Sequence, residues 1–327
     1  MADNQERPLV TFALFAYNQE RFIREAVEGA LAQTYSPLQI ILSDDCSSDR
    51  TFEYMKEMAR SYEGPHQIVL NRNESNQGIG GHINRVMRLV KGDLIIVAAG
   101  DDISMPQRTG TVVNVWLKAG RKADLLCSDY VAISEDGNNL EVKQGCIIES
   151  LTAEMMARYE YGIIGATAAW TSRLWQKAGE LPQGTVNEDV VLSFRAVLCG
   201  GIEYINRPLL YYREGVSMWI ARGAAGHVEI QRRNGVLAKN SFKNAQTAMD
   251  DALKLERRDL LPLLKIRVAG SNLLHRLHNS QIPHLNEIIH VIFSGGRIGL
   301  ILRAYLRRKL PITHAFVHMS RRLYFRQ

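Results

Sequence analysis

The sequence of 327 residues predicts an α/β fold with a mainly parallel sheet, flanked by helices and followed by a helical C-terminal region. Three observations predict it. Short apolar runs alternate with segments of helical apolar spacing through about residue 118. The run Leu94–Ala99 is apolar and contains β-branched residues, which is typical of a strand buried on both faces. After Gly226 the strand alternation stops and the apolar spacing is helical.

Composition narrows the class of protein. Hydrophobic residues make up 46% of the chain and charged residues 23%, which excludes a globally disordered chain. The four cysteines are widely spaced and form no C-x-x-C pair, so neither a zinc site nor a redox motif is indicated. We expect free thiols in a reducing cytosol. The polar start of the chain and the lack of a bilayer-length apolar run predict a cytoplasmic protein, or one bound to a membrane surface.

The net charge of +6 is unevenly distributed. Residues 1–220 carry 21 Lys and Arg against 28 Asp and Glu, whereas residues 221–327 carry 19 against 6. Any basic surface that faces a partner is therefore expected in the C-terminal third.

The first half of the chain predicts βαβ units. Right-handed crossovers between parallel strands place the loops that follow the strands at one common edge of the sheet. The expected strands are 9–15, 38–42, 68–70 and 94–99, and the expected helices are 20–33, 51–61, 83–90 and 106–118.

The next hundred residues are less regular. Asp136-Gly137-Asn138-Asn139 is a strong turn signal and predicts a hairpin after a strand at 124–131. Weak or short helices are expected at 154–161 and 174–178, and a longer helix is expected from Asn187. Two strands are expected at 202–205 and 209–212, followed by a mobile loop at 213–226.

Polar residues follow the predicted strands where each strand ends. Tyr17 and Asn18 follow the first, Asp44 and Asp45 the second, and Asp101-Asp102 the fourth. Ligands bind at this edge in open α/β sheets, and two adjacent carboxylates favour a hard cation such as Mg²⁺ or Mn²⁺.

Each of these features has a simpler alternative. Asp102 or Ser104 could cap the helix that begins near Pro106, and Asp49 could cap the helix at Thr51. The acidic pair Glu188-Asp189 could serve only the dipole of its helix. His82 is expected to be a helix-start or surface histidine rather than a metal ligand.

Two nucleotide-binding signatures are poorly supported. The segment Asn76-Gln77-Gly78-Ile79-Gly80-Gly81 is glycine-rich, but it has no Lys-Ser/Thr ending and follows the third strand. A P-loop and a dinucleotide fingerprint are therefore not indicated.

Five short motifs occur in the order found in one enzyme family. With them, residues 8–220 resemble the family 2 glycosyltransferases, inverting enzymes that have the GT-A fold and use nucleotide-activated sugars. The motifs are Phe15-Ala16-Tyr17-Asn18, Ser43-Asp44-Asp45-Cys46-Ser47-Ser48-Asp49, Asn76-Gln77-Gly78, Gly100-Asp101-Asp102 and Glu188-Asp189.

The resemblance implies a role for each motif. It implies a GT-A domain over 1–225, with a nucleotide-sugar part at about 1–110 and an acceptor part at about 111–225, before a basic helical region at 226–327. Gly100 departs from the family pattern, which often has another Asp there. By this resemblance, the residues at the nucleotide are Phe15, Tyr17, Asn18, Asn76 and Gly78, and Asp44 accepts from the imide N–H of uracil or thymine. Asp101 would hold the ribose or the first phosphate, and Asp102 would bind Mn²⁺ or Mg²⁺. Asp189 would be the catalytic base, and Glu188 would orient that base or contact the acceptor.

The resemblance also implies a reaction. The protein would move a sugar from a UDP- or dTDP-type donor to a glycan or lipid-linked glycan, in surface polysaccharide synthesis. A sugar-nucleotide nucleotidyltransferase is one alternative, but it needs a basic glycine-rich loop where this chain has Phe15-Ala16-Tyr17-Asn18. A non-catalytic nucleotide-sugar or glycan-binding protein is another.

The last 31 residues, 297–327, contain eight Lys or Arg and no acid. Leucines interleaved with arginines predict a basic amphipathic helix, and a helix of this kind can lie on an anionic membrane surface. The alternative is a helical extension that packs on the catalytic domain or forms an oligomer interface. Nucleic acid is not an expected partner, because no recognition motif accompanies the charge.

Overall fold

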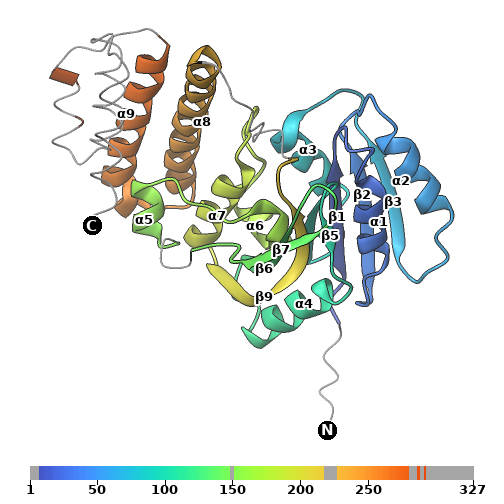
Figure 1. Ribbon diagram of the computed structural model, residues 1–327. Helices are drawn as coiled ribbons and strands as arrows, with labels where there is room; N and C mark the ends of the chain where they lie inside the picture. The colour runs from blue at the N-terminus through green and yellow to red at the C-terminus, as the bar shows by residue number, and fades with distance from the viewer. Residues whose placement is uncertain (1–6, 148–150, 217–226, 280–285, 288–290, 292–327) are drawn as a thin grey trace.

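The computed structural model describes residues 7–147, 151–216, 227–279, 286–287 and 291. Its centre is a nine-stranded sheet in the order β3-β2-β1-β4-β8-β6-β9-β5, with β7 paired to β6 (Figure 1). The strands are β1 (Val10–Ala16), β2 (Leu38–Asp44), β3 (Gln67–Arg72), β4 (Leu94–Ala99), β5 (Ile103–Ser104), β6 (Leu125–Ile133), β7 (Asn139–Lys143), β8 (Ala169–Thr171) and β9 (Ile202–Arg213).

The sheet changes character along its width. β1 pairs in parallel with β2 and β4, and β2 pairs in parallel with β3. Beyond β4 the pairing is mixed, because β8 runs antiparallel to both β4 and β6 while β9 is parallel to β6. The predicted α/β sheet is thus confirmed, with its parallel part at β3-β2-β1-β4. The carboxyl ends of β1, β2, β4, β6 and β9 all face the same edge.

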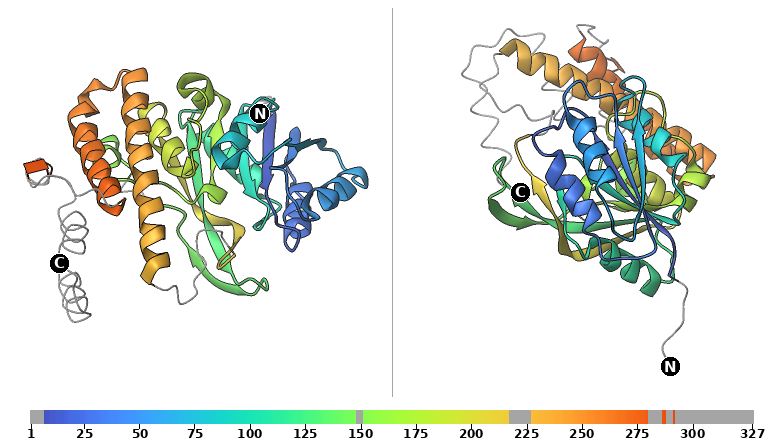
Figure 2. Two further views of the ribbon diagram at one scale, coloured as in Figure 1. Left: turned by 90° about the horizontal axis from the view of Figure 1, so that it is seen from above. Right: turned by 90° about the vertical axis from the view of Figure 1, so that its right-hand side faces the viewer.

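Helices cover both faces of the sheet (Figure 2). Phe12 and Leu14 of β1 pack with α1, α2 and α4, whereas Ala13 and Phe15 pack with α3, α6 and α7. This alternation follows from the period of two along a strand, and it explains why the central strands are apolar on both faces. The sheet-covering helices are α1 (Ile23–Leu31), α2 (Thr51–Arg60), α3 (Gly78–Met87), α4 (Arg108–Lys118), α6 (Ser172–Ala178) and α7 (Glu188–Leu198).

A pair of longer helices stands at one end of the molecule (Figure 1). α8 (His227–Lys254) and α9 (Leu261–His278) lie side by side and pack on α5 (Ala153–Arg158) and α7 through a separate apolar cluster. The predicted helical C-terminal part is therefore confirmed, while the basic segment 297–327 lies outside the described residues. Among the residues described, no helix is both long and apolar enough to cross a membrane.

Three local expectations need correction. α3 begins at Gly78 rather than near Ile83, so the glycine-rich segment is largely helical; Gly78 has a positive φ of 67° that suits glycine. The two strands expected at 202–205 and 209–212 form the single strand β9, whose register against β6 shifts near Pro208. Arg213 ends this strand instead of opening a loop. Residues 217–226 of that expected loop are not described.

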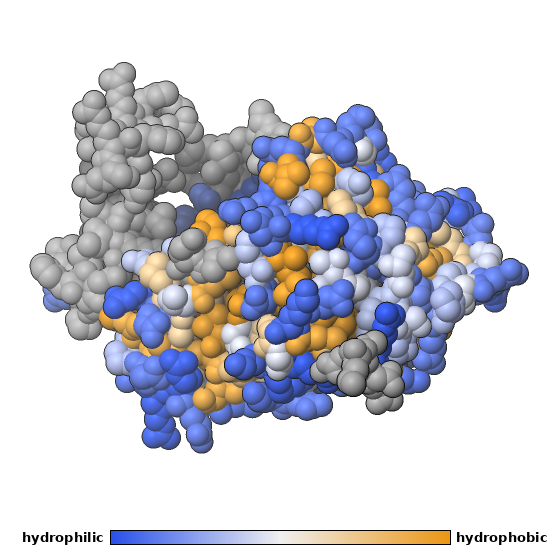
Figure 3. Space-filling view, turned by 90° about the horizontal axis from the view of Figure 1, so that it is seen from below, coloured by the Kyte–Doolittle hydropathy of each residue, from blue (hydrophilic) through white to orange (hydrophobic). Residues whose placement is uncertain are grey.

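The predicted hairpin is present, and its outer strand carries apolar side chains. Leu140 and Val142 of β7 are exposed, and they alternate with Glu141 and Lys143. Seen from below, apolar residues gather in the middle of one molecular face and hydrophilic residues border them (Figure 3). Lys143 bonds Glu214 at 2.7 Å and Glu141 at 3.0 Å, and such charges discourage an edge strand from pairing with another chain.

Arg108, at the start of α4, is the largest of the fully buried side chains. Its guanidinium donates to Ser104 Oγ at 2.8 Å and to the carbonyl oxygen of Ala166 at 2.7 Å. Ala166 belongs to the short 3-10 turn η2 (Gly165–Thr167) just before β8. Arg108 therefore ties the segment that follows β4 to the turn that leads into β8.

We expect Arg108→Ala to lower the free energy of unfolding by about 1–3 kcal/mol, because the Ala166 carbonyl and the Ser104 hydroxyl lose their buried hydrogen-bond donor. Arg88→Ala, which breaks the exposed ion pair with Glu180, is the matched control and should cost less than about 1 kcal/mol. Urea unfolding measures both. Equal losses for the two variants would contradict this role of Arg108.

Candidate functional site

The loops after β1 and β2 are locked together. The backbone N–H of Asn18 donates to Ser47 Oγ at 2.8 Å, and the side chain of Asn18 accepts from the Ser48 N–H, also at 2.8 Å. The Gln19 N–H donates to Thr51 Oγ1 at 2.8 Å. Asn18 has a φ of 51°, a conformation that Asn tolerates better than most residues. The half-buried Tyr17 is held at the start of this locked pair of loops.

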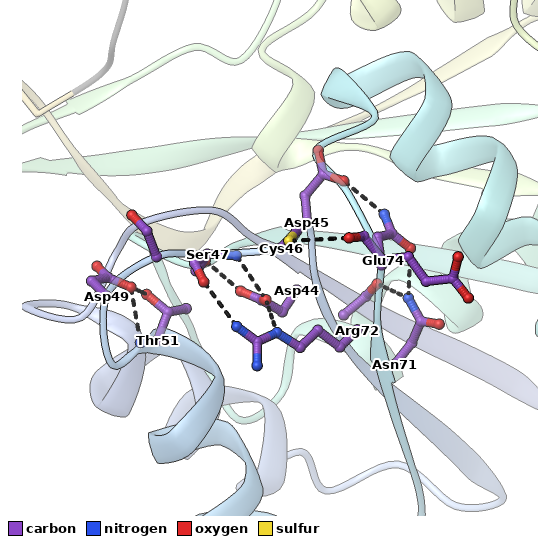
Figure 4. Close-up of polar contacts among 12 residues, drawn as sticks. Asp44, Asp45, Cys46, Ser47, Asp49, Thr51, Asn71, Arg72 and Glu74 are labelled. Carbon is purple, nitrogen blue, oxygen red and sulfur yellow. Dashed lines mark hydrogen bonds and ion pairs between the residues drawn. The ribbon is translucent and has the colours of Figure 1, made fainter.

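Asp44 ends β2 and is fully buried. One oxygen of its carboxylate accepts from the Ser47 N–H at 2.9 Å, and the other accepts from the Ser47 hydroxyl. Arg72, from the end of β3, reaches the same carboxylate at 3.4 Å and the Ser47 carbonyl at 2.9 Å (Figure 4). Burial raises the pKa of Asp44, and the bonds from Ser47 and the charge of Arg72 offset only part of that increase.

Asp45 connects β2 to the start of α3. Its Oδ1 accepts from Asn73 Nδ2 at 2.7 Å and from the Gln77 N–H at 2.9 Å. Asn76 in turn accepts from the Gly78 N–H at 2.9 Å. Asn76 and Gly78 are exposed, so a ligand at this edge can reach them, and the Gly78 N–H is already bonded to Asn76.

Asp101 and Asp102 follow β4, as predicted, and neither cap of α4 that the sequence allowed is formed. Asp102 is buried, and its Oδ1 accepts from the Arg213 N–H at 2.8 Å. Arg213 also donates to the Asp101 carbonyl at 3.0 Å and pairs with Glu25 at 2.7 Å. Burial raises the pKa of both carboxyls, and the charge of Asp101 raises that of Asp102 further.

Gly100 has a steric reason to lack a side chain. A Cβ at this position would lie 2.4 Å from Gln19 Oε1 and 2.9 Å from Ala16 Cβ. An Asp, which the family pattern often has here, would require the Gln19 side chain and the end of β1 to move. The site therefore has two carboxylates after β4 and no room for a third.

Glu188 and Asp189 open α7 and are half-buried. Burial and the neighbouring Asp189 raise the pKa of Glu188 to about 8. Burial also raises the pKa of Asp189 to about 6, with a smaller contribution from the charge of Glu160. Asp189 Oδ1 accepts from the Val190 N–H at 2.8 Å. A Cβ on Gly165 of η2 would lie 3.1 Å from Glu188 Oε1, so this turn packs directly against the acidic pair.

Contacts between neighbouring elements connect these segments around one edge. The Gly80 N–H of α3 donates to the Thr185 carbonyl at 3.3 Å, just before α7. η2 touches Glu188 and is tied by Arg108 to the segment after Asp102. The predicted residues thus lie on interconnected elements, although no direct bond joins Asp44, Asp102 and Asp189 in the part of the chain described. Their individual roles stay predictions.

Asp49 and His82 were expected to have only local or surface roles. Asp49 Oδ1 accepts from the Thr51 N–H at 3.0 Å, but the N-cap residue of α2 is Arg50, so Asp49 is not in the expected cap position. His82 is buried rather than on the surface, and its Nε2 lies 2.6 Å from Ser43 Oγ. Burial lowers the pKa of His82 to about 4, so it is neutral at physiological pH.

Sequence analysis missed four residues of this region: Gln19, Arg72, Arg108 and Arg213. A signal existed for Arg72 and Arg213, because each is the last residue of a strand that ends at the ligand-binding edge. No such signal marks Gln19 or Arg108, whose positions depend on contacts with distant segments.

The raised pKa of Glu188 predicts a pH-dependent stability. Between the ordinary value of 4.5 and about 8, the folded protein holds a proton that the unfolded chain releases, so stability falls as pH rises through this window. Glu188→Gln removes this loss, and its melting temperature should exceed that of the wild type increasingly from pH 5 to pH 8.5. The exposed Glu63→Gln is the control. A constant difference between Glu188→Gln and wild type would contradict the shift.

The chain resembles known proteins in both sequence and structure. EpsE of Bacillus subtilis, a glycosyltransferase by name, is 35% identical over 101 residues, which are 31% of this chain and 36% of that protein. The uncharacterized glycosyltransferase MJ1057 of Methanocaldococcus jannaschii is 29% identical over 143 residues, or 43% of this chain and 48% of that protein. The matches thus span about a third to a half of these relatives.

Solved structures with the same fold include two glycosyltransferases. Residues 1–349 of Staphylococcus aureus TarS, in complex with UDP-GlcNAc, give a TM-score of 0.56 at 13% identity, covering 92% of this chain and 91% of that one. The mannosyltransferase PcManGT of Pyrobaculum calidifontis, in complex with GDP-Man and Mn²⁺, gives 0.54 at 16% identity, covering 95% and 90%. The fold is therefore that of GT-A glycosyltransferases. The sequence profile described as glycosyl transferase family 2 matches residues 11–176, half of the chain, and the protein belongs to that family.

Proposed function

We propose that this protein transfers a sugar, with inversion, from a nucleoside diphosphate donor to a hydroxyl group of a glycan or lipid-linked glycan. One observation carries the proposal: Asp44, Asp102 and Asp189 come from three distant segments, and the elements that hold them contact one another around one edge of the sheet. Family membership supports a glycosyltransferase, and the solved relatives were captured with UDP-GlcNAc and with GDP-Man.

The nucleoside is assigned to the edge formed by β1, β2 and α3. Phe15 and Tyr17 would lie at the base, with Asn18, Asn76 and Gly78 around it. Asp44 would accept from the imide N–H of a UDP- or dTDP-type donor. Asp44 is fully buried, so the side chains over it, Arg72 among them, must move before a base can reach it.

Asp102 is the candidate ligand for Mn²⁺ or Mg²⁺. Its Oδ1 accepts from the backbone of Arg213, which leaves Oδ2 without a protein partner among the described residues. Oxygen ligands suit these hard ions, so the residues fit the metal. The described residues include no group of three or more His, Cys, Asp or Glu that could hold an ion, so we expect phosphate and water to complete its shell. When bound, the ion supplies electrostatic stabilisation of the leaving diphosphate.

Asp189 is the candidate general base. It would take the proton from the acceptor hydroxyl as that oxygen attacks the anomeric carbon from the face opposite the diphosphate. With a pKa of about 6, Asp189 is mostly ionised at neutral pH and still more basic than an ordinary Asp. General base catalysis of this kind contributes about 10²- to 10⁴-fold. Glu188, whose pKa is about 8, is mostly protonated at neutral pH and can donate a hydrogen bond.

The biological process and the cellular location of the protein stay predictions. A role in surface polysaccharide synthesis and a cytoplasmic location at an anionic membrane follow from the sequence. The segment proposed to bind the membrane, 297–327, is outside the described residues.

A donor screen tests the proposed function. Melting temperature and donor hydrolysis are followed with UDP-, dTDP- and GDP-sugars, with and without Mn²⁺, because a true donor stabilises the folded protein by mass action. We expect Asp102→Ala to lose the Mn²⁺-dependent part of the stabilisation. Asp189→Ala should keep donor binding and lose about 10²- to 10⁴-fold in turnover.

Asp136→Ala, in the exposed β6–β7 turn, is the matched control and should behave like the wild type. Unchanged turnover in both site variants would rule out the proposed site. Stabilisation by a donor without any turnover would favour the non-catalytic binding protein instead.

A further inference from the structure

The C-terminal helix α8 is bonded to the segment that carries the acidic pair. Near its end, Lys254 donates to the Ala178 carbonyl at 2.7 Å. One turn earlier, Asp251 forms a buried bidentate pair with Arg195 of α7, at 2.8 and 3.0 Å. Two further turns back, Asn244 faces the beginning of α7. The C-terminal part of α8, from Asn244 to Asp251, therefore lies against α7.

Asn244 connects two separate segments at that position. Its side chain is 5% exposed. The Nδ2 group donates to Glu160 Oε1, from the chain between α5 and η2, and lies 3.5 Å from Asn187 Oδ1. Asn187 is the N-cap residue of α7 and immediately precedes Glu188. One buried amide thus contacts both the residue before the acidic pair and a third carboxylate beside it.

We propose that Asn244 is a positioning residue for the catalytic base: it fixes the Asn187–Asp189 turn and holds the Glu160 carboxylate beside Asp189. This inference rests on the proposed function, because it takes Asp189 as the base. It also gives α8, the helix that carries Asn244, a part in the reaction.

The neighbours of Asp189 support this role. Glu188 on its own helix and Glu160 are the carboxylates that face it, and the charge of Glu160 contributes to its raised pKa. Two further neighbours of the α7 start are uncharged: Gly165 of η2, which packs against Glu188, and Thr185, whose carbonyl accepts from the Gly80 N–H of α3. From α8 come the neutral Asn244 and the cation of Lys243, whose Nζ lies 3.2 Å from a Cβ placed on Gly184. Among these groups, Asn244 is the one that holds Glu160 in place.

The anchoring of α8 does not depend on Asn244. The Arg195–Asp251 pair and Lys254 already fix α8 to α7 and to the residues before it. Removal of the Asn244 amide is therefore expected to loosen the start of α7 more than the helix packing. A base displaced by about 1 Å can cost up to about 10²-fold in rate.

The experiment compares Asn244→Ala with Asn240→Ala, a half-buried Asn one turn earlier on the same helix. The ¹³C carboxyl signal of Asp189, assigned by its loss in Asp189→Asn, is titrated in each variant. We expect the pKa of Asp189 to fall in Asn244→Ala, because Glu160 is no longer held beside it, and to stay at the wild-type value in Asn240→Ala. With the donor identified by the screen, kcat should fall about 10- to 10²-fold while the donor KM changes less than twofold.

Glu160→Gln is the second variant and keeps the test decisive if Asn244→Ala does not fold. It removes the charge without touching α8, and the pKa of Asp189 should fall here as well. Wild-type titration of Asp189 in all the folded variants, or equal kcat for Asn244→Ala and Asn240→Ala, would overturn the proposal. If Asp189→Asn retains full activity, the proposed base is wrong, whereas the titrations still report on the contact between Asn244 and Glu160.

Discussion

The buried guanidinium of Arg108 is the interaction on which the arrangement of the site depends. It joins Ser104, in the short strand after Asp102, to the carbonyl oxygen of Ala166, in the turn that packs against Glu188. A cation in the interior is costly unless it is paired and hydrogen-bonded. Burial lowers the pKa of Arg108 to about 10, and the nearby charge of Asp102 offsets part of this effect, so the group stays charged at neutral pH. The carboxylates after β4 and the acidic pair at the start of α7 therefore share one structural support.

Much of the part of the site that follows β1, β2 and β4 was predictable from the sequence. The central strands are buried on both faces, and their apolar runs are short and bounded, so their ends could be assigned closely. Because parallel strands end at the same edge, the positions of Asp44 and Asp101-Asp102 followed from those ends. The contacts of Asp44 could not be predicted in the same way. Arg72 reaches it from the next strand, and that contact depends on the register between β2 and β3.

The acidic pair at the start of α7 was predictable only as a motif. Glu188 and Asp189 matched a family pattern, but an acidic first turn has the same sequence whether it serves the helix dipole or a reaction. The surroundings distinguish the two cases. Gly165 packs against Glu188, the charge of Glu160 acts on Asp189, and Asn244 contacts Glu160 and Asn187. Gly165, Glu160 and Asn244 are separated from the motif by more than twenty residues, and no local periodicity connects them. Arg213 was missed for a related reason, because β9 continues through Pro208 as one strand and brings its last residue to Asp102.

The two loops that hold Tyr17 and Asp44 are cross-bonded through Asn18, Gln19, Ser47 and Thr51. Because these bonds satisfy the backbone of each loop with groups from the other, the two loops form one preorganised unit in the free protein. A ligand that docks there finds the backbone of both loops already ordered, and the side chains over Asp44, such as Arg72, are what must move. Entropy lost on binding should then come mainly from the ligand itself, so affinity at this end would be sensitive to the shape of the base.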